Sequence, residues 1–460
     1  MPQRCTITII GAGFSGSMLA VQFAHAKGHY PYDIHLVDPR PAPGLGLAYS
    51  APRPEYLLNV RAGRISAFPD KPQHFVEWLR AKGLPGDEDV FYPRQTYGQY
   101  IQECVSQVLG EAANGMRIQW HSQAAIAATI DKTDNTALVE LADGHVLRSH
   151  RVVLALGNFP PLGLASAGLG GNFPPNYHPN PWTPGALTGI APQDSVLLIG
   201  TGLTSVDVLM ALHADGHQGS IVAVSRHGWW PTVHGPGQHA QYPSFYASDL
   251  VHLTDVGAVV RVVRQHIRAA QAAGYNWRDV LDSLRPDLGR IWTNWPLPEQ
   301  ERFLRHVSSL WSVVRHRSPE QNVAMVEQLR SRGQLQTHLG RVRQIAPQGS
   351  DLSVEITHGS QQAQLLARHV IACTGPLLDY SRVQDPLIKG LREAQHLLSD
   401  PLRLGIQTDE HGALLDADGL ASSLFFTLGP SRRPAYFEST AVPELREQAA
   451  ALAQHILSQL

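Results

Sequence analysis

Glycines at a fixed spacing open the chain and could bind a diphosphate. Gly11, Gly13 and Gly16 form a G-x-G-x-x-G motif directly after an apolar run at residues 6–10. In this motif the first glycine makes a tight turn, the second lets a pyrophosphate approach the backbone, and the third lets the helix pack closely on the strand. Asp38 ends the next apolar run, where a carboxylate can accept a hydrogen bond from a ribose hydroxyl. These residues predict a dinucleotide site.

A second glycine-rich turn lies near residue 200. Gly200 and Gly202 follow the apolar run 195–199, and Ser205 stands where a third glycine is usual. The next strand ends in Ser225-Arg226-His227 rather than in an acid. A hydroxyl and a guanidinium bind a 2′-phosphate, which a carboxylate would repel. The sequence therefore predicts NADP(H) here; the alternative is that the arginine is a solvated surface cation.

The two motifs together indicate which cofactor each one binds. A first site with an acidic ribose partner and a second site midway along the chain are typical of two-dinucleotide flavoproteins. We therefore expect FAD at the first site and NADPH at the second, with a hydride passing from the nicotinamide to the flavin. The protein's task is then to bind and orient the two cofactors.

Both motifs require the same local structure, a strand followed by a tight turn and a helix. Further buried strands are expected at residues 152–157, 370–376 and 424–430. We expect an α/β fold with two Rossmann-like dinucleotide-binding domains in a glutathione-reductase-like arrangement. The expected FAD domain is discontinuous and covers residues 1–160 and 370–460. The expected NADP domain covers residues 190–369 and includes a helical insertion at 228–330.

Some finer expectations concern single elements. Residues 116–153 alternate apolar and polar side chains around a turn, which predicts an antiparallel meander. The strand at 370–376 is expected to return the chain to the first sheet, with Cys373 as a buried structural residue. Pro443 and Glu444 predict the start of the closing helix.

Composition narrows the class of protein. The chain has 460 residues and a net charge of −2, without a long basic block, which argues against nucleic acid as the main partner. No apolar run approaches the roughly 20 residues that span a bilayer. The three cysteines are far apart in the sequence, so we expect no metal site and no redox pair. A cytoplasmic protein without a signal peptide, either a monomer or a homo-oligomer, is the expectation.

Motifs along nearly the whole chain resemble those of a known family. They include the segments 44–49, 57–60, 66–69, 91–98, 225–231, 311–317, 373–376 and 440–446. In these segments the chain resembles the bacterial FAD/NAD(P)-binding flavoproteins that include flavin-dependent N-monooxygenases, one branch of which makes nitrosuccinate from aspartate. More broadly it is similar to the class B flavin monooxygenases.

The resemblance implies a reaction. Flavin reduced by NADPH adds O₂ to form a C4a-hydroperoxyflavin, and a small amine, which could carry a carboxylate, attacks the distal oxygen and becomes N-hydroxylated. A dry pocket protects the oxidant. The alternatives are S-oxygenation, an NAD(P)H-dependent oxidoreductase or oxidase without oxygen transfer, and a flavin-bound sensor without turnover.

The candidate cofactor residues come from the motifs and from the resemblance. For FAD they are Gly11, Gly13, Phe14, Ser15, Gly16, Asp38, Pro39, Asn59, Val60, Arg94, Tyr97, Gly157, Gly429, Thr440 and Ala441. For NADPH they are Gly200, Gly202, Thr204, Ser205, Ser225, Arg226 and His227. Arg94 and Tyr97 could instead be packing and turn residues.

Candidate substrate residues lie in and next to the helical insertion. An apolar stripe from Phe303 to Val314 predicts one helix that ends by Pro319, with basic residues on its other faces. Guanidinium groups are a common way to hold a carboxylate, but such residues are often a solvated basic face. The candidates are His234, Arg285, Arg290, Arg305, Arg315 and His316.

A linker before the second nucleotide motif partly matches a class B pattern. His178 and Trp182 have the expected separation, but the glycine of the pattern is missing and Phe173 is one residue out of place. A Baeyer–Villiger reaction is therefore not expected, and the alternative for His178 is a loop histidine with a local hydrogen bond.

Overall fold

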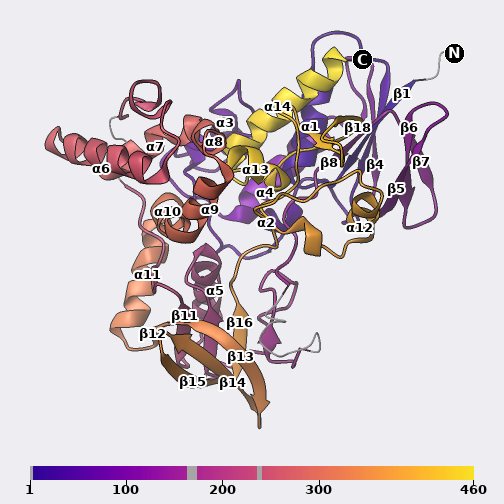
Figure 1. The fold of residues 1–460 in the computed structure, drawn as a ribbon. Helices are drawn as coiled ribbons and strands as arrows, with labels where there is room; N and C mark the ends of the chain where they lie inside the picture. Colours follow the sequence, from indigo (N-terminus) through magenta and orange to yellow (C-terminus); the bar gives the residue numbers. More distant parts are fainter. Residues whose placement is uncertain (1–3, 163–172, 236–240, 460) are drawn as a thin grey trace.

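The computed structural model describes residues 4–162, 173–235 and 241–459. Two domains lie one above the other, with a group of helices to one side (Figure 1). The first domain is built on a seven-stranded sheet whose central strands are parallel. Its strands, in spatial order, are β17 (Ala413–Leu415), β18 (Ala421–Thr427), β8 (Arg151–Leu154), β1 (Cys5–Ile10), β2 (Tyr32–Val37), β4 (Arg117–His121) and β3 (Gly110–Glu111).

Helices cover one face of this sheet, and a small sheet covers the other. The first and last long helices, α1 and α14, pack against each other and share the largest apolar core with β1 and β2. On the opposite face, a three-stranded antiparallel sheet packs with α12. The helices are α1 (Phe14–His25), α2 (Gly46–Tyr49), α3 (His74–Ala81), α4 (Arg94–Ser106), α12 (Pro386–Glu393), α13 (Arg433–Tyr436) and α14 (Val442–Ser458), and the small sheet is β5 (Ala125–Asp131), β6 (Thr136–Leu141) and β7 (Val146–Ser149).

The second domain contains a five-stranded, all-parallel sheet. Its order is β12 (Leu335–Leu339), β11 (Ile221–Ser225), β10 (Val196–Ile199), β16 (His369–Ala372) and β9 (Tyr177–His178). Helices α5 (Leu203–Ala214) and α11 (Glu320–Ser331) pack together on one side. The antiparallel strands β13 (Arg341–Gln348), β14 (Asp351–His358) and β15 (Gln361–Ala367) lie at its far end (Figure 1).

The helical insertion lies between β11 and β12. It contains α6 (Val256–Ala272), α7 (Trp277–Ser283), α8 (Leu288–Thr293), α9 (Leu297–His306) and α10 (Ser308–Arg315). Its own core is rich in aromatic side chains and includes Phe437 of the first domain, whose ring lies 4.9 Å from that of Trp292. The insertion is thereby attached to the first domain as well as to the second.

The α/β fold with two dinucleotide-type sheets and a helical insertion agrees with the prediction from the sequence. Val442 begins the last helix, next to Pro443, as predicted. Single-turn helices lie at Ala62–Arg64, Tyr246–Leu250, Arg285–Asp287, Tyr380–Arg382 and Pro430–Arg432. None of the helices in the described ranges combines the length and hydropathy needed to cross a membrane.

Three local expectations are wrong. The strand at 369–372 pairs with β10 in the second sheet, so the chain returns to the first domain only after it. Within 116–153, only β5, β6 and β7 form an antiparallel meander, because β4 and β8 pair in parallel with strands of the main sheet. The single stripe helix is two helices, α9 and α10, that meet at Val307.

Candidate dinucleotide and substrate site

The first glycine motif folds as a tight connection between β1 and α1. Gly11 has a φ of +100°, and a Cβ placed there would lie 2.3 Å from the Ala155 carbonyl oxygen at the end of β8. A Cβ at Gly16 would lie 1.9 Å from the Gly11 carbonyl oxygen. Gly13 is the N-cap of α1 and provides no side-chain cap, so the first-turn N–H groups are left for a ligand. Phe14 and Ser15, which follow, are buried.

Asp38 lies at the end of β2 and faces this turn. Its Oδ2 accepts a hydrogen bond from the Ala12 amide at 2.8 Å, and its Oδ1 accepts from Arg40 Nε at 2.8 Å. Burial raises the pKa of the Asp38 carboxyl, but the hydrogen bonds from Arg40 and Ala12 outweigh it and hold the pKa below its ordinary value. Because Arg40 already binds both oxygens, a ribose hydroxyl has to displace one of these bonds to reach Asp38.

Segments far apart in the sequence meet at this turn. Gly429 follows β18 with a φ of +89°, and a Cβ there would lie 2.9 Å from Ser15 Oγ. Gln448 of α14 accepts a hydrogen bond from the Gly429 amide at 2.9 Å. Thr440 is exposed and Ala441 is the N-cap of α14, again without a side-chain cap. The predicted residues Gly429, Thr440 and Ala441 thus come from one connection that passes the start of α1.

Four further residues predicted to bind FAD, Pro39, Asn59, Val60 and Gly157, lie outside the two helix N-termini described above. Pro39 is exposed, and Gly157 has a φ of +68° with open space around it. Asn59, next to Val60, accepts a 3.0 Å hydrogen bond from His234 through its carbonyl oxygen. The contacts of these residues with FAD stay predictions.

Arg94 and Tyr97 already have protein partners. Arg94 pairs with Asp207 of α5 at 2.7 Å, which links the two domains. Tyr97 is fully buried, and its hydroxyl donates to the Ile65 carbonyl at 2.8 Å. In this structure Tyr97 is a packing residue and Arg94 is an interdomain residue, and their roles toward FAD stay predictions.

The second glycine motif repeats the first turn with one change. Gly200 has a φ of +117°, and a Cβ there would lie 2.6 Å from the Cys373 carbonyl oxygen. Ser205 Oγ donates to the Gly200 carbonyl at 2.8 Å, so the serine is held against the turn that a third glycine would approach. Gly202 is the N-cap of α5, and the position of its missing Cβ faces open space. This open helix N-terminus suits a diphosphate.

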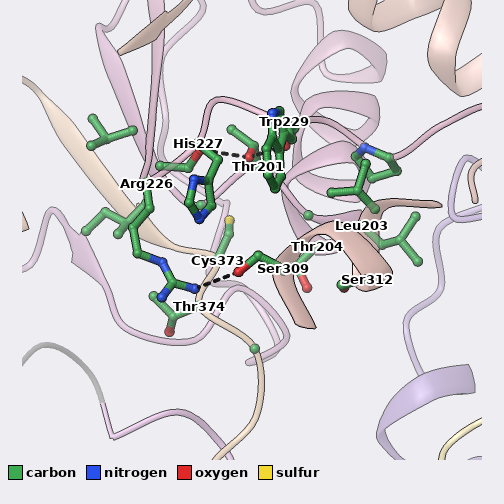
Figure 2. Close-up of a pocket in the computed structure, with 18 of the residues that line it drawn as sticks. Thr201, Leu203, Thr204, Arg226, His227, Trp229, Ser309, Ser312, Cys373 and Thr374 are labelled. Atoms are coloured by element: carbon green, nitrogen blue, oxygen red, sulfur yellow. Dashed lines mark hydrogen bonds between the residues drawn. The ribbon is translucent and has the colours of Figure 1, made fainter. Parts of the chain in front are cut away.

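The end of β11 carries the predicted 2′-phosphate residues. Ser225 Oγ accepts hydrogen bonds from Thr201 Oγ1 and from the Gly228 amide, both at 3.0 Å, which stabilise the turn. Arg226 is exposed and donates to Ser309 Oγ of α10 at 3.3 Å (Figure 2). His227 stacks on Trp229 with ring centroids 4.4 Å apart.

A cavity of about 780 Å³ extends from this second turn. Its walls come from the carboxyl ends of β10, β11 and β16 and from α10 (Figure 2). Arg433 of α13 also lines the cavity. The lining includes Gly200, Thr201, Gly202, Thr204, Ser225, Arg226, His227, Trp229, Ser309, Ser312, His316, Arg341, Cys373 and Arg433. Cys373 is buried, as predicted, and burial raises the pKa of its thiol to about 12.

The predicted substrate residues separate into two groups. Arg290 is 71% exposed and pairs with Asp287, and Arg305 is exposed on α9. Neither lines the cavity. Arg315 pairs with Glu438 at 3.0 Å behind the cavity wall. The structure therefore does not gather these arginines around a ligand, because they lie on different faces of separate helices.

The two predicted histidines have different positions. His316 lines the cavity, and burial lowers the pKa of its imidazole, as Arg315 and Arg433 also do. His234 lies on the loop after β11 and packs on Phe91 of the first domain at 4.9 Å between ring centroids. Burial lowers the pKa of His234 to about 4, so the imidazole is neutral at neutral pH.

The linker histidine has a structural environment. His178 lies in β9, and its Nε2 is 3.1 Å from Nδ1 of His369. Burial lowers the pKa of His178 to about 4, and His369 adds to the effect. Trp182 packs on Tyr56 with ring centroids 5.6 Å apart. These contacts agree with the alternative of a histidine in a local hydrogen bond.

Two arginines that line the cavity were not predicted from the sequence. Arg341, at the start of β13, lines the same cavity as Arg226. Arg433, at the start of α13, lines it from the first domain. The only signal for Arg433 was its place in an Arg432-Arg433-Pro434 segment just after the β18 glycine, where parallel strands end at the ligand-binding edge of a sheet.

The residues present fit the two expected cofactors. Both glycine turns leave an uncapped helix N-terminus, and in both a Cβ at the first glycine would collide with a neighbouring strand. The first turn has a buried carboxylate at its ribose position, and the second has a guanidinium there. In the described part of the chain, no group of three or more metal-ligating side chains is arranged to hold a metal ion.

Comparison with known proteins agrees with this geometry. The model of the FAD-NAD(P)-binding family matches residues 8–159. A nitrosuccinic acid synthase from Aspergillus oryzae is 28% identical over 203 residues, which cover 40% of this chain. The match spans 31% of the length of that curated relative.

Solved structures match along the whole chain. The ornithine N-hydroxylase of Kutzneria sp. 744, solved with reduced FAD, NADP⁺ and L-ornithine, aligns over 100% of both chains with a TM-score of 0.66 and 13% identity. The L-lysine 6-monooxygenase of Pseudomonas syringae aligns over 100% of both chains with a TM-score of 0.66 and 16% identity. These matches confirm the resemblance inferred from the sequence: residues 8–159 match the FAD-NAD(P)-binding family, and the whole chain shares its fold with the ornithine and lysine N-hydroxylases.

Proposed function

We propose that this chain is an FAD- and NADPH-dependent monooxygenase that hydroxylates the nitrogen of a small amine. The observation that carries the proposal is the cavity of about 780 Å³, which joins the second glycine turn to Arg433 of the first domain. A nicotinamide nucleotide bound at that turn therefore extends toward the domain that contains the FAD-type turn. O₂ as co-substrate and a cytoplasmic location belong to the same proposal.

Residues of this chain then have defined tasks. The N-terminus of α1 holds the diphosphate of FAD, and Asp38 binds its ribose. The N-terminus of α5 holds the diphosphate of NADPH, and Arg226, with Arg341 on the same cavity wall, binds its 2′-phosphate. The bound flavin supplies the redox chemistry with NADPH and O₂.

Part of the cavity lining is apolar and comes from Trp229, Pro231 and Val313. Apolar surface beside a bound substrate favours oxygen transfer to that substrate over loss of the oxidising equivalent as peroxide. Nitrogen as the acceptor atom is supported by the likeness to an ornithine N-hydroxylase and to a nitrosuccinic acid synthase.

The test is a coupled measurement on the purified protein. Amines and amino acids are supplied with NADPH and O₂, and NADPH consumed, hydrogen peroxide released and product mass are measured together. We expect one product, heavier than its amine by one oxygen atom, with little peroxide. NADPH consumption that appears entirely as peroxide would identify an oxidase, and oxygen gained only by thioethers would identify S-oxygenation.

A further inference from the structure

Helix α6 carries a row of arginines that the proposed reaction does not use. Arg261, Arg264 and Arg268 are exposed, and their spacing places them on one face of the helix, the arginine face. On the opposite face, Val259 and Ala270 are buried in the core of the insertion. The arginine face therefore points to solvent, and α6 extends outward at one side of the molecule (Figure 1).

The arginine face has no counter-charge in its own molecule. Residues 256–278 contain four arginines and no aspartate or glutamate, and the whole chain has a net charge of −2. Because these arginines contribute +4, the rest of the chain carries a net charge of −6. Within the described ranges, none of Arg261, Arg264 and Arg268 makes an ion pair or a side-chain hydrogen bond. A basic surface on an otherwise acidic molecule favours contact with an acidic surface of another copy.

The first domain presents an acidic surface in the loop after α3. Asp87, Glu88 and Asp89 are consecutive and exposed, and they are called the acidic loop below. Among the ion pairs of the described residues, only a 4.0 Å contact between Asp89 and Arg61 involves this loop. Most of its negative charge is therefore available to a partner.

The backbone of the acidic loop is held in place. The Ala62 amide donates to the Val90 carbonyl at 3.0 Å, and the Gly63 amide donates to the Glu88 carbonyl at 2.9 Å. Little conformational entropy is then lost when a partner binds the loop. Three consecutive residues span at most about 7 Å, and a helix rises about 10 Å from the first arginine of the face to the last. Long arginine side chains can therefore reach all three carboxylates.

The acidic loop and α6 belong to neighbouring parts of the molecule. Arg61, beside the loop, donates to the Gly235 carbonyl at 2.8 Å, and a Cβ placed at Gly235 would lie 3.3 Å from Arg278 Cδ of α7. Helix α7 in turn packs against α6. When two complementary surfaces lie near each other, a two-fold axis beside them pairs each surface with its complement in a second copy, so that two contacts form together.

We propose that two copies of this chain associate through a two-fold contact in which the arginine face of each copy binds the acidic loop of the other. Leu84 and Val90, which are 38% and 42% exposed beside the acids, add apolar area to this contact. Each contact joins the insertion of one copy to the first domain of the other. Single exposed ion pairs contribute little, so the association depends on several charges acting together.

The test reverses the charge of each surface in the FAD-loaded protein. One variant reverses the arginine face with Arg261→Glu, Arg264→Glu and Arg268→Glu. A second variant reverses the acidic loop with Asp87→Lys, Glu88→Lys and Asp89→Lys, and a third variant carries all six changes. A control has the same net charge as the first variant but changes exposed cations of other elements, with Lys132→Glu, Arg332→Glu and Arg382→Glu. Sedimentation velocity measures the mass over a range of concentrations, and flavin content and thermal unfolding report folding.

We expect the wild type to form a dimer at low salt, with a Kd that rises at least about tenfold between about 0.05 and 0.5 M NaCl. Each singly reversed variant should be a monomer, because like charges then face each other, and the control should form a dimer like the wild type. The variant with all six changes should form a dimer again. An equimolar mixture of the two singly reversed variants should also do so, since both contacts of the mixed dimer then join opposite charges.

Several outcomes would overturn the proposal. It is wrong if the wild type is a monomer at all concentrations, if a reversed variant with normal flavin content stays a dimer, or if the mixture stays monomeric. A monomeric wild type that binds polyglutamate through the arginine face would assign this face to a different acidic partner. Where a reversed variant has lost its flavin, Arg264→Glu and Glu88→Lys, each at the centre of its row, take its place, and an unchanged Kd in both would contradict the contact.

Discussion

At the scale of single residues, Gly11 and Gly200 occupy equivalent positions in the tight turns of the two domains. Each has a positive φ, and each passes so close to the carbonyl at the end of a neighbouring strand that no side chain fits. The strand ends are those of β8 at Ala155 and of β16 at Cys373. The turn therefore requires glycine for two reasons, its backbone conformation and the space that a Cβ would take.

A matched pair of variants separates these two reasons. Gly11→Ala places a Cβ 2.3 Å from the Ala155 oxygen, whereas Gly83→Ala, at a φ of +75°, meets no atom within 4 Å. We expect Gly83→Ala to cost about 1 kcal/mol of unfolding free energy and Gly11→Ala at least about 3 kcal/mol, with loss of bound flavin. Urea unfolding and flavin absorbance measure both effects, and equal costs in the two variants would contradict the close approach.

Arg226 gives a prediction about cofactor choice. It lies at the end of β11, is exposed and lines the cavity next to the second glycine turn. Arg226→Ala should raise the KM for NADPH by about 10- to 100-fold, because a charge-assisted bond to the 2′-phosphate is lost, and should change the KM for NADH little. Steady-state kinetics with both nucleotides provides the comparison. A similar rise for NADH would show that the arginine does not read the 2′-phosphate.

At the scale of elements, β9 and β16 are joined by a polar chain beside their backbone pairing. His178 of β9 faces His369 of β16, and His369 Nε2 lies 3.1 Å from Asp194 Oδ2. His178 has a folded-state pKa of about 4 against an ordinary value of 6.5. The unfolded chain therefore takes up a proton between pH 6.5 and 4 that the folded chain resists, so stability falls as the pH falls through this window.

This pair predicts a defined pH effect. Between pH 7 and pH 5, protonation of His178 in the unfolded chain should cost about 2 kcal/mol of unfolding free energy. His178→Gln should reduce the pH dependence of the wild type by that amount. Urea unfolding at the two pH values measures this. An unchanged pH dependence in His178→Gln would mean that the ring is as easily protonated in the folded chain as in the unfolded one.

Strand β16 was predicted to join the first sheet but pairs with β10 in the second. Residues 369–372 form a short, fully buried apolar strand, as the composition predicts. β10 is also a short, fully buried apolar strand, and β8 is buried after its first residue, so burial alone does not indicate which of two parallel sheets a strand joins. The single-helix expectation for 303–314 failed for a related reason, because a helical period continues across the break at Val307.

At the scale of the whole molecule, charged side chains link the two domains. Arg94 at the start of α4 binds Asp207 of α5 at 2.7 Å, and Arg94 Nε donates to the Leu57 carbonyl at 3.1 Å. Burial raises the pKa of Asp207 to about 6, against the effect of Arg94. Arg53 adds a second, more exposed link to Asp215 at the end of α5. These contacts help to set how the second domain is placed on the first.

A double-mutant cycle tests the buried link. Arg94→Met should cost about 3 kcal/mol of unfolding free energy, because it leaves the Asp207 carboxylate buried without a partner, and adding Asp207→Asn should recover much of that cost. Arg53→Gln should cost less than Arg94→Met, since Asp215, one of the two carboxylate partners of Arg53, is half exposed. Urea unfolding of the four proteins gives the coupling, and additive effects would contradict the link. Flavin content in the same variants tests the predicted contact of Arg94 with FAD.

Much of this protein was determined by local sequence. A few neighbouring residues specify the strand, turn and helix around each glycine motif. Both motifs could therefore be predicted, together with Asp38 after the first motif and Arg226 after the second. The fold class followed from the same runs of apolar residues. Such features depend on backbone conformation and side-chain volume, which short segments fix by themselves.

The arrangement of charges was decided only by the tertiary structure. Arginines 285 and 315 looked available in the sequence, but folding brings Glu438 and Glu444 of the last segment against them. In the described part of the chain, the same folding leaves the Arg433 side chain, which lines the cavity, without an ion pair. Whether a guanidinium is neutralised, exposed or free for a ligand depends on carboxylates more than a hundred residues away, and a pattern of spacing carries no information about such contacts.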